Sequence, residues 1–249
     1  MTRSLAFCLL MLPALPAADS VPPARTPVLL ELFTSEGCSS CPPADALLAK
    51  LDELQPVTGV TVIALEEHVD YWDHLGWRDP FSSADFTARQ QRYAESLHVE
   101  SPYTPQMVID GRLEFVGNDS NRALHELANA ARTPKTPVHV AVRDYSPDRV
   151  SLDVHADAAG SSGDVWLALA ETGLSTDVAR GENAGRNLKH SAVVRKLSAI
   201  GTVKAGEPFS AEPLVKLAKQ WKPENLRAVV FVQDASGKVL GAAEVALAR

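Results

Sequence analysis

The stretch from residue 27 to residue 43 reads PVLLELFTSEGCSSCPP, and the rest of the chain is best understood from it. Its first part, Val28 to Phe33, is an apolar run with the length and composition of a buried strand. A short polar turn follows, and Cys38 and Cys41 then precede a helical pattern. The N-terminus of a helix stabilises a nearby thiolate through its free backbone N–H groups and its dipole. The order strand, turn, cysteine pair, helix therefore predicts a thiol–disulfide centre.

The N-terminal residues have the features of an export signal. Arg3 supplies a positive charge, an apolar segment runs from Leu5 to Leu15, and small residues follow it. We therefore expect a signal peptide over residues 1–18, a lead-in over residues 19–27, and a periplasmic or secreted protein.

Removal of this signal would discard Cys8, the third cysteine of the chain. Cys38 and Cys41 would then be the only cysteines of the mature protein, in an oxidising compartment where a close pair forms a disulfide.

The composition restricts the partners. The 249-residue chain has a net charge of −7 and no cluster of Lys and Arg, which argues against nucleic acid and anionic membranes as partners. No apolar stretch beyond the N-terminus is long enough for a transmembrane helix, so we expect no membrane span after signal removal.

Strand and helix patterns alternate from residue 28 to residue 132, in the order β-α-β-α-β-β-α. Asp110-Gly111, between two apolar runs, is a strong hairpin signal. The other expected elements are strands at Val28–Phe33 and Val60–Leu65 and helices at Ala44–Leu54 and Asn121–Ala131. A further helix, capped by Ser82 or Ser83, is expected to run to about Leu97, and the two strands of the hairpin are expected on either side of Asp110-Gly111 within residues 103–116.

This order, the Cys-x-x-Cys at the first helix and the Thr104-Pro105 pair before the hairpin resemble the thioredoxin superfamily. Cys-Ser-Ser-Cys-Pro-Pro, His-Val-Asp-Tyr-Trp-Asp and Tyr-Thr-Pro-Gln-Met-Val are similar to motifs of a secreted bacterial thioredoxin-like family of largely unassigned function. The resemblance implies a thioredoxin-like α/β domain over residues 28–135. It also implies a cis peptide bond before Pro105, with that proline beside the sulfur atoms.

The hydrophobic pattern of the sequence changes after the Pro-rich segment 133–137. Short alternating apolar runs then recur, which is typical of an antiparallel sandwich, and a single helical pattern covers residues 211–220. We therefore expect an α/β thioredoxin-like domain followed by an all-β, sandwich-like C-terminal domain over residues 136–249. The polar, Gly-punctuated segment 180–190 is expected to be a solvated loop, or else to dock the two domains or contact a partner.

Three interpretations of the cysteine pair remain open: a working redox centre, a structural disulfide and a metal site. Cys38 would be the nucleophile of a redox centre and Cys41 the resolving thiol. A structural bridge is disfavoured because this one would close a very short loop. Zinc needs more ligands than the pair offers, whereas copper(I) would accept two thiolates and a third ligand from His68.

Several other side chains are candidates for the site. Glu31, an acid in an apolar run, is either a solvent-facing strand residue or a buried acid that exchanges a proton with Cys41. Thr104, His68 and Asp70 are candidate substrate-binding residues. The last two belong to the segment 68–77, which is either a substrate platform or a hydrophobic cap formed by Trp72 and Trp77.

The sequence therefore predicts an exported thiol–disulfide oxidoreductase that acts on protein thiols or disulfides, with catalytic Cys38, Cys41, Pro105 and Glu31. We expect no cofactor and no resident metal in this reaction, and a redox partner protein is consistent with it. The alternative is a non-catalytic partner-binding or copper-binding protein on a thioredoxin scaffold.

Overall fold

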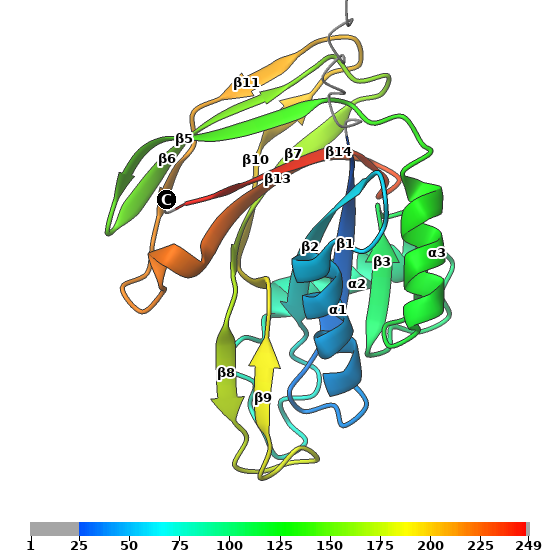
Figure 1. Cartoon of the computed structure of the whole chain (residues 1–249), viewed down its shortest axis with the longest axis vertical. Helices are drawn as coiled ribbons and strands as arrows, with labels where there is room; N and C mark the ends of the chain where they lie inside the picture. Colours follow the sequence, from blue (N-terminus) through cyan, green and yellow to red (C-terminus); the bar gives the residue numbers. More distant parts are fainter. Residues whose placement is uncertain (1–24, 248–249) are drawn as a thin grey trace, which may run out of the picture.

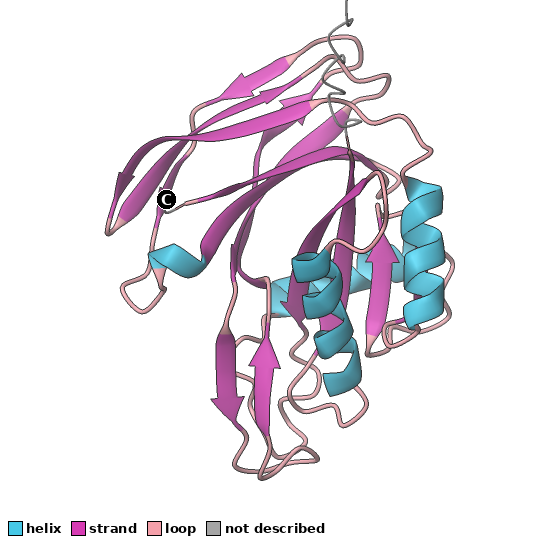
Figure 2. Ribbon diagram, viewed as in Figure 1, coloured by secondary structure: helices cyan, strands magenta, loops and turns pink. Residues whose placement is uncertain are grey.

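The computed structural model describes residues 25–247. About 42% of these residues lie in strands and 18% in helices (Figure 2). None of the helices in this part of the chain is long and apolar enough to cross a membrane. The expected signal peptide, residues 1–18, and most of the expected lead-in lie outside the described residues.

A mixed eight-stranded sheet forms the centre of the molecule (Figure 1). Its strands follow the order β14-β13-β7-β10-β2-β1-β3-β4. Their bounds are β1 Thr26–Thr34, β2 Val60–His68, β3 Gln106–Ile109, β4 Leu113–Val116, β7 Gly163–Glu171, β10 Val193–Val203, β13 Leu226–Asp234 and β14 Val239–Ala246. The β1–β2 and β2–β10 pairs are parallel, and the others are antiparallel.

Helices cover the part of this sheet that contains β1. They are α1 Pro42–Leu54, α2 Ala84–Ser96 and α3 Ser120–Ala130. Leu32 and Phe33 are successive strand residues and therefore point to opposite faces. Leu32 lies near Ala44 of α1, whereas Phe33 packs edge-on against Tyr93 of α2, so α1 and α2 lie on opposite faces of the sheet.

A second layer covers the other part. It is a four-stranded sheet of β5 Val138–Ser146, β6 Arg149–Ala156, β11 Phe209–Ala211 and β12 Leu214–Lys216 (Figure 1). The alternating apolar residues of β6, Val150, Leu152 and Val154, pack against β7 and β13. A separate hairpin of β8 Leu174–Asp177 and β9 Asn187–His190 extends toward α1.

The expected fold class is wrong, although the order of elements before residue 132 is as expected. Instead of a thioredoxin-like α/β domain followed by a separate all-β domain, the chain forms a mostly β structure around one large mixed sheet. The reason is the edge of β2: Val193 of β10 pairs with Glu66 there, and β7, β13 and β14 continue the sheet. An unpaired strand edge offers N–H and C=O groups to any strand that reaches it.

Like the large sheet, the hydrophobic core is shared by the early and the late strands of the chain. One cluster joins Leu30 and Ile63 of the first strands to Ala170, Val194 and Phe231 of the later ones. Apolar side chains from before and after residue 135 are therefore buried in one shared core.

Two local predictions have opposite outcomes. The hairpin at Asp110-Gly111 is confirmed, and both residues have positive φ, 49° and 60°, as a type I′ turn requires. The helix expected over residues 211–220 is wrong. Strand β12 occupies Leu214–Lys216, and the only helical turn near it is a 3₁₀ turn at Pro223–Asn225.

Candidate functional site

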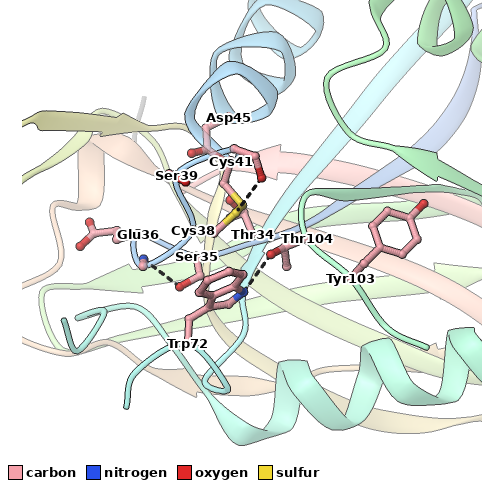
Figure 3. Close-up of a disulfide and its surroundings, with 12 residues drawn as sticks. Thr34, Ser35, Glu36, Cys38, Ser39, Cys41, Asp45, Trp72, Tyr103 and Thr104 are labelled. Carbon is pink, nitrogen blue, oxygen red and sulfur yellow. Dashed lines mark hydrogen bonds between the residues drawn. A yellow bond between two sulfur atoms is a disulfide. The ribbon is translucent and has the colours of Figure 1, made fainter. Parts of the chain in front are cut away.

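Cys38 and Cys41 form a disulfide at the start of α1 (Figure 3). Cys41 is the N-cap residue, and its carbonyl oxygen accepts hydrogen bonds from the N–H groups of Ala44 and Asp45. Proline at the first helical positions fits because those N–H groups have no partner within the helix. The Ser40 hydroxyl lies 3.3 Å from Cys38 Sγ, where it can donate to a thiolate.

The Thr104–Pro105 peptide bond is cis, as expected from the resemblance. Pro105 is buried, and a Cβ added at Gly117 would lie 3.1 Å from Pro105 Cβ and 3.2 Å from Ala44 Cβ. Pro105 therefore lies against the first turn of α1. Thr104 is on the same side, and its hydroxyl accepts a 2.9 Å hydrogen bond from Trp72 Nε1 (Figure 3).

Asp45 is a buried acid beside the disulfide. It lies four residues after Cys41, on the same side of α1, and accepts a 2.6 Å hydrogen bond from the Thr34 hydroxyl (Figure 3). Burial and then repulsion from Glu66 raise its pKa to about 7, against the opposing effects of His190, Thr34 and His68. Near neutral pH this carboxyl group can therefore both accept and donate a proton.

The disulfide is completely covered, since both cysteines are 0% exposed. The loop between β8 and β9 supplies part of the cover. The side-chain amide of Asn183 donates to the carbonyls of Glu36 and Cys38 at 2.8 and 3.0 Å, and Glu182 accepts from the Ser39 N–H at 3.1 Å. The segment 180–190 thus contacts the cysteine loop.

Trp72 and Trp77 complete this cover, as expected for a cap. A Cβ added at Gly37 would lie 3.0 Å from Trp72 Cβ, and Trp77 Nε1 donates a 2.8 Å hydrogen bond to Glu36 Oε2. Both tryptophans are half-buried. The cover therefore comes from two segments that are about a hundred residues apart in the chain.

A chain of buried, alternating carboxylate and imidazole groups lies beneath the cysteine loop. We call it the His–carboxylate chain; its members in order are Asp79, His68, Glu66, His190 and Glu36. His68 Nδ1 is 2.6 Å from Asp79, and His68 Nε2 is 3.1 Å from Glu66 Oε1. His190 Nδ1 is 2.6 Å from the same Glu66 oxygen, and His190 Nε2 is 3.1 Å from Glu36.

The carboxylates of this chain shift the pKa values of its histidines upward. Burial opposes the charged imidazolium, but Asp79 and then Glu66 raise the pKa of His68 well above its usual value. For His190, Glu66 and Glu36 outweigh burial and raise the pKa to about 9. Conversely, burial would raise the pKa of Glu66, but His190 and then His68 lower it.

Two expected site residues lie apart from the disulfide. Glu31 is on the α2 face of the sheet, where Arg89 Nε donates to it at 2.7 Å and the Tyr93 hydroxyl at 2.6 Å. Asp70 accepts a 2.6 Å hydrogen bond from Thr87 of α2. Neither contact reaches the cysteine loop.

The structure thus brings together Cys38, Cys41, Thr104 and Pro105, and it places His68 in the buried chain below them. Asp45, Glu66, His190 and Asn183 were not identified from the sequence. Asp45 had a usable signal, its i+4 position after Cys41. The other three act through partners distant in the chain, so no local pattern marks their role.

These features define a disulfide-containing protein built on one mixed β-sheet. A family model described as a protein of unknown function, DUF1223, matches residues 29–233. The chain belongs to this family.

Comparison with solved structures finds a similar protein from Agrobacterium tumefaciens, with a TM-score of 0.70 and 28% sequence identity over 90% of this chain and 96% of that one. A domain of the outer membrane lipoprotein Omp28 from Porphyromonas gingivalis gives a TM-score of 0.32 at 12% identity, over 46% of this chain and 88% of that chain, which is too low to support an argument. No curated protein matches the chain significantly.

Proposed function

We propose that the protein is an exported thiol–disulfide oxidoreductase that acts on protein thiols or disulfides. The observation that carries this proposal is the placement of Asp45, a buried acid with a pKa of about 7, one turn after Cys41. Disulfide exchange needs a group that takes up and returns the proton of the buried thiol. A purely structural bridge has no use for such a group, and perturbed acids cluster at functional sites.

The proposed reaction has two steps. The Cys38 thiolate attacks a partner disulfide, which forms a mixed disulfide and releases one partner thiolate. Cys41 then loses its proton to Asp45 and attacks the Cys38 sulfur, which releases the second partner thiolate and closes the Cys38–Cys41 bond. The partner is thereby reduced and the protein oxidised, and the reverse sequence oxidises a partner dithiol.

The surroundings of the pair support this assignment. The cysteine pair stands between a strand and a helix, and Thr104 and Pro105 lie against the same helix start. These are the local features on which the resemblance to the thioredoxin superfamily rests, and we assign the centre to that kind of chemistry. Export is supported by the signal-like residues 1–18, and a redox partner protein would return the pair to its working state.

Substitution of each cysteine tests the proposal. Cys38→Ala should abolish exchange with a protein disulfide, because no attacking thiolate remains. Cys41→Ala should accumulate mixed disulfides, which non-reducing gels and mass spectrometry detect. Full turnover by Cys38→Ala would refute the oxidoreductase assignment.

The complete burial of both sulfur atoms favours a second candidate, a non-catalytic partner-binding or copper-binding protein. In this case the reduced protein would take up copper(I) through Cys38 and Cys41, since both nitrogens of His68 face carboxylates, or it would hold an inert disulfide and bind a partner elsewhere. Stoichiometric copper uptake without disulfide turnover would favour this candidate.

A further inference from the structure

The His–carboxylate chain contains three donor atoms that converge on one point. His68 Nε2 and His190 Nδ1 both face Glu66 Oε1, and the three atoms lie within 4.8 Å of one another. Zinc binds imidazole nitrogen and carboxylate oxygen at about 2.0–2.2 Å, so ligands in a tetrahedral site are about 3.3 Å apart. The observed separations of 3.1 and 2.6 Å need only a small outward movement to admit an ion.

The remaining nitrogen of each histidine is held by a carboxylate. Asp79 holds Nδ1 of His68 at 2.6 Å, and Glu36 holds Nε2 of His190 at 3.1 Å. Metal-binding histidines almost always donate their second N–H in this way, because it fixes the ring and makes the ligating nitrogen more basic. Glu66 is fixed as well, since its second oxygen accepts a 2.9 Å hydrogen bond from the Ser191 N–H.

These carboxylates are themselves supported. Asp79 accepts hydrogen bonds from the N–H groups of Glu36 and Phe81, both at 2.8 Å, and Glu36 accepts one from Trp77. The side chains of all five residues in the His–carboxylate chain are 0% exposed. The arrangement is thus rigid and shielded from water, as a preorganised metal site requires.

The charges also match a divalent cation. Each imidazole nitrogen faces a carboxylate oxygen, so with the carboxylates ionised all four contacts are hydrogen bonds only when both rings carry two protons. Three carboxylates and two imidazolium groups then leave one negative charge. A divalent ion that replaces the two protons facing Glu66 leaves the same charge, so binding adds no net buried charge.

We propose that Glu66, His68 and His190 form a buried binding site for a divalent transition-metal ion, with zinc as the best match to two imidazoles and one carboxylate. Asp79 and Glu36 are positioning residues that orient the two rings. The site uses no sulfur atom, and it does not depend on the proposed redox function.

Because the site is buried, the ion has to enter while the chain is open. The test therefore unfolds the protein in chelator and refolds it with zinc or cobalt(II), followed by gel filtration and metal analysis. We expect one zinc per chain. Cobalt should give visible d–d bands without a thiolate charge-transfer band.

Variants locate the ion. His190→Gln should retain less than about a tenth of the zinc, and Asp79→Asn should weaken zinc binding about 10- to 100-fold. His155→Gln is the matched control, since His155 and His139 form an exposed stacked pair that could take up metal non-specifically. This variant, and the double variant Cys38→Ser with Cys41→Ser, should both keep one zinc.

A measurement on the unmodified protein covers the case in which buried variants fail to fold. Crystals grown from zinc-loaded protein should show an anomalous difference peak between His68 Nε2 and His190 Nδ1. A peak at His139 and His155 alone, or refolded wild-type protein without zinc, would overturn the proposal. Loss of zinc in the cysteine double variant would also overturn it.

Discussion

Asp45 combines three properties that matter for exchange at the neighbouring disulfide. It is buried, it follows Cys41 by one helical turn, and its pKa is about 7. Glu31 was expected to serve as this acid, but it is engaged with Arg89 on the other face of the sheet. At the scale of single residues, the direction in which a side chain points determines which acid lies on the same side of the sheet as the cysteine pair.

We predict that Asp45→Asn slows the resolution of the mixed disulfide about 10²-fold, a typical loss when a general base is removed. Only the ionised carboxylate can accept the Cys41 proton, so the wild-type rate should rise as the pH passes upward through about 7. This rise should be absent in the variant. The assay follows the second release of thionitrobenzoate after reduced, metal-free protein reacts with Ellman's reagent.

The groups around Asp45 that can influence this pH profile are Glu66, His68, His190 and Thr34. Asp85→Asn is a suitable control, because Asp85 occupies the first turn of α2 and is exposed. An Asp45→Asn protein with wild-type rate and pH profile would exclude the proposed proton transfer.

At the scale of elements, the β8–β9 hairpin forms part of the cover over the disulfide. Its loop is held to the cysteine loop by hydrogen bonds from Asn183 to two carbonyls and from Ser39 to Glu182. A partner thiol cannot reach a sulfur atom that is 0% exposed, so exchange requires this cover to move. Loops with such a role are commonly the less stable parts of a structure.

We predict that Asn183→Ala speeds reduction of the disulfide by dithiothreitol. The loss of two buried hydrogen bonds should favour opening by about 1–3 kcal/mol, which corresponds to about 5- to 150-fold in rate. Trapping the freed thiols by alkylation and measuring the mass shift gives the rate.

The control is Asn187→Ala in the same hairpin, where the exposed side chain donates a hydrogen bond to Asp177 rather than to the cysteine loop. Its reduction rate should equal that of wild type. Equal rates for wild type and Asn183→Ala would show that the hairpin is not the barrier.

At the scale of the whole molecule, the large sheet and the shared core join the first and last thirds of the chain. The turn at Asp110-Gly111 packs against the β13–β14 turn, and Lys135 pairs with Asp110 at 2.5 Å. Arg89 of α2 also donates to Gln233 of β13 at 3.1 Å. The parts of the chain before and after residue 135 are therefore in direct contact.

Gly111→Ala tests this contact. An added Cβ would lie 1.8 Å from the Gly237 carbonyl oxygen, so the backbones would have to separate. The positive φ costs about 1–2 kcal/mol for a residue with a side chain, and overpacking adds about 1–3 kcal/mol. The free energy of unfolding measured in urea should fall by the sum of these two costs.

Gly59→Ala is the matched control. Gly59 also has a positive φ, 76°, but nothing lies within 4 Å of its added Cβ. Gly59→Ala should lower the free energy of unfolding only by the cost of a positive φ at a residue with a side chain. Equal losses for the two variants would contradict a tight contact between the two turns.

Much of the local structure was predictable, because apolar periodicity and turn residues act within a few positions. The hairpin at Asp110-Gly111 and the helix after Cys41 are examples. Glu66 and His68 were not recognised as neighbours, because the apolar run that marks this strand ends at Leu65 whereas β2 continues to His68. The helix expected over 211–220 failed because β6 recruits Leu214–Lys216 as a strand partner, an influence that comes from distant residues.

The sequence by itself determined the strand–helix order around Cys38 and Cys41 and the faces on which nearby side chains lie, because these follow from the periods of strand and helix. The tertiary structure decided that β10 extends the sheet at β2, and it brought His190 to Glu66 across 124 residues of chain. Strand edges pair through backbone groups that almost every residue carries, so local sequence does not specify the partner. A site assembled from such edges is therefore a property of the whole fold.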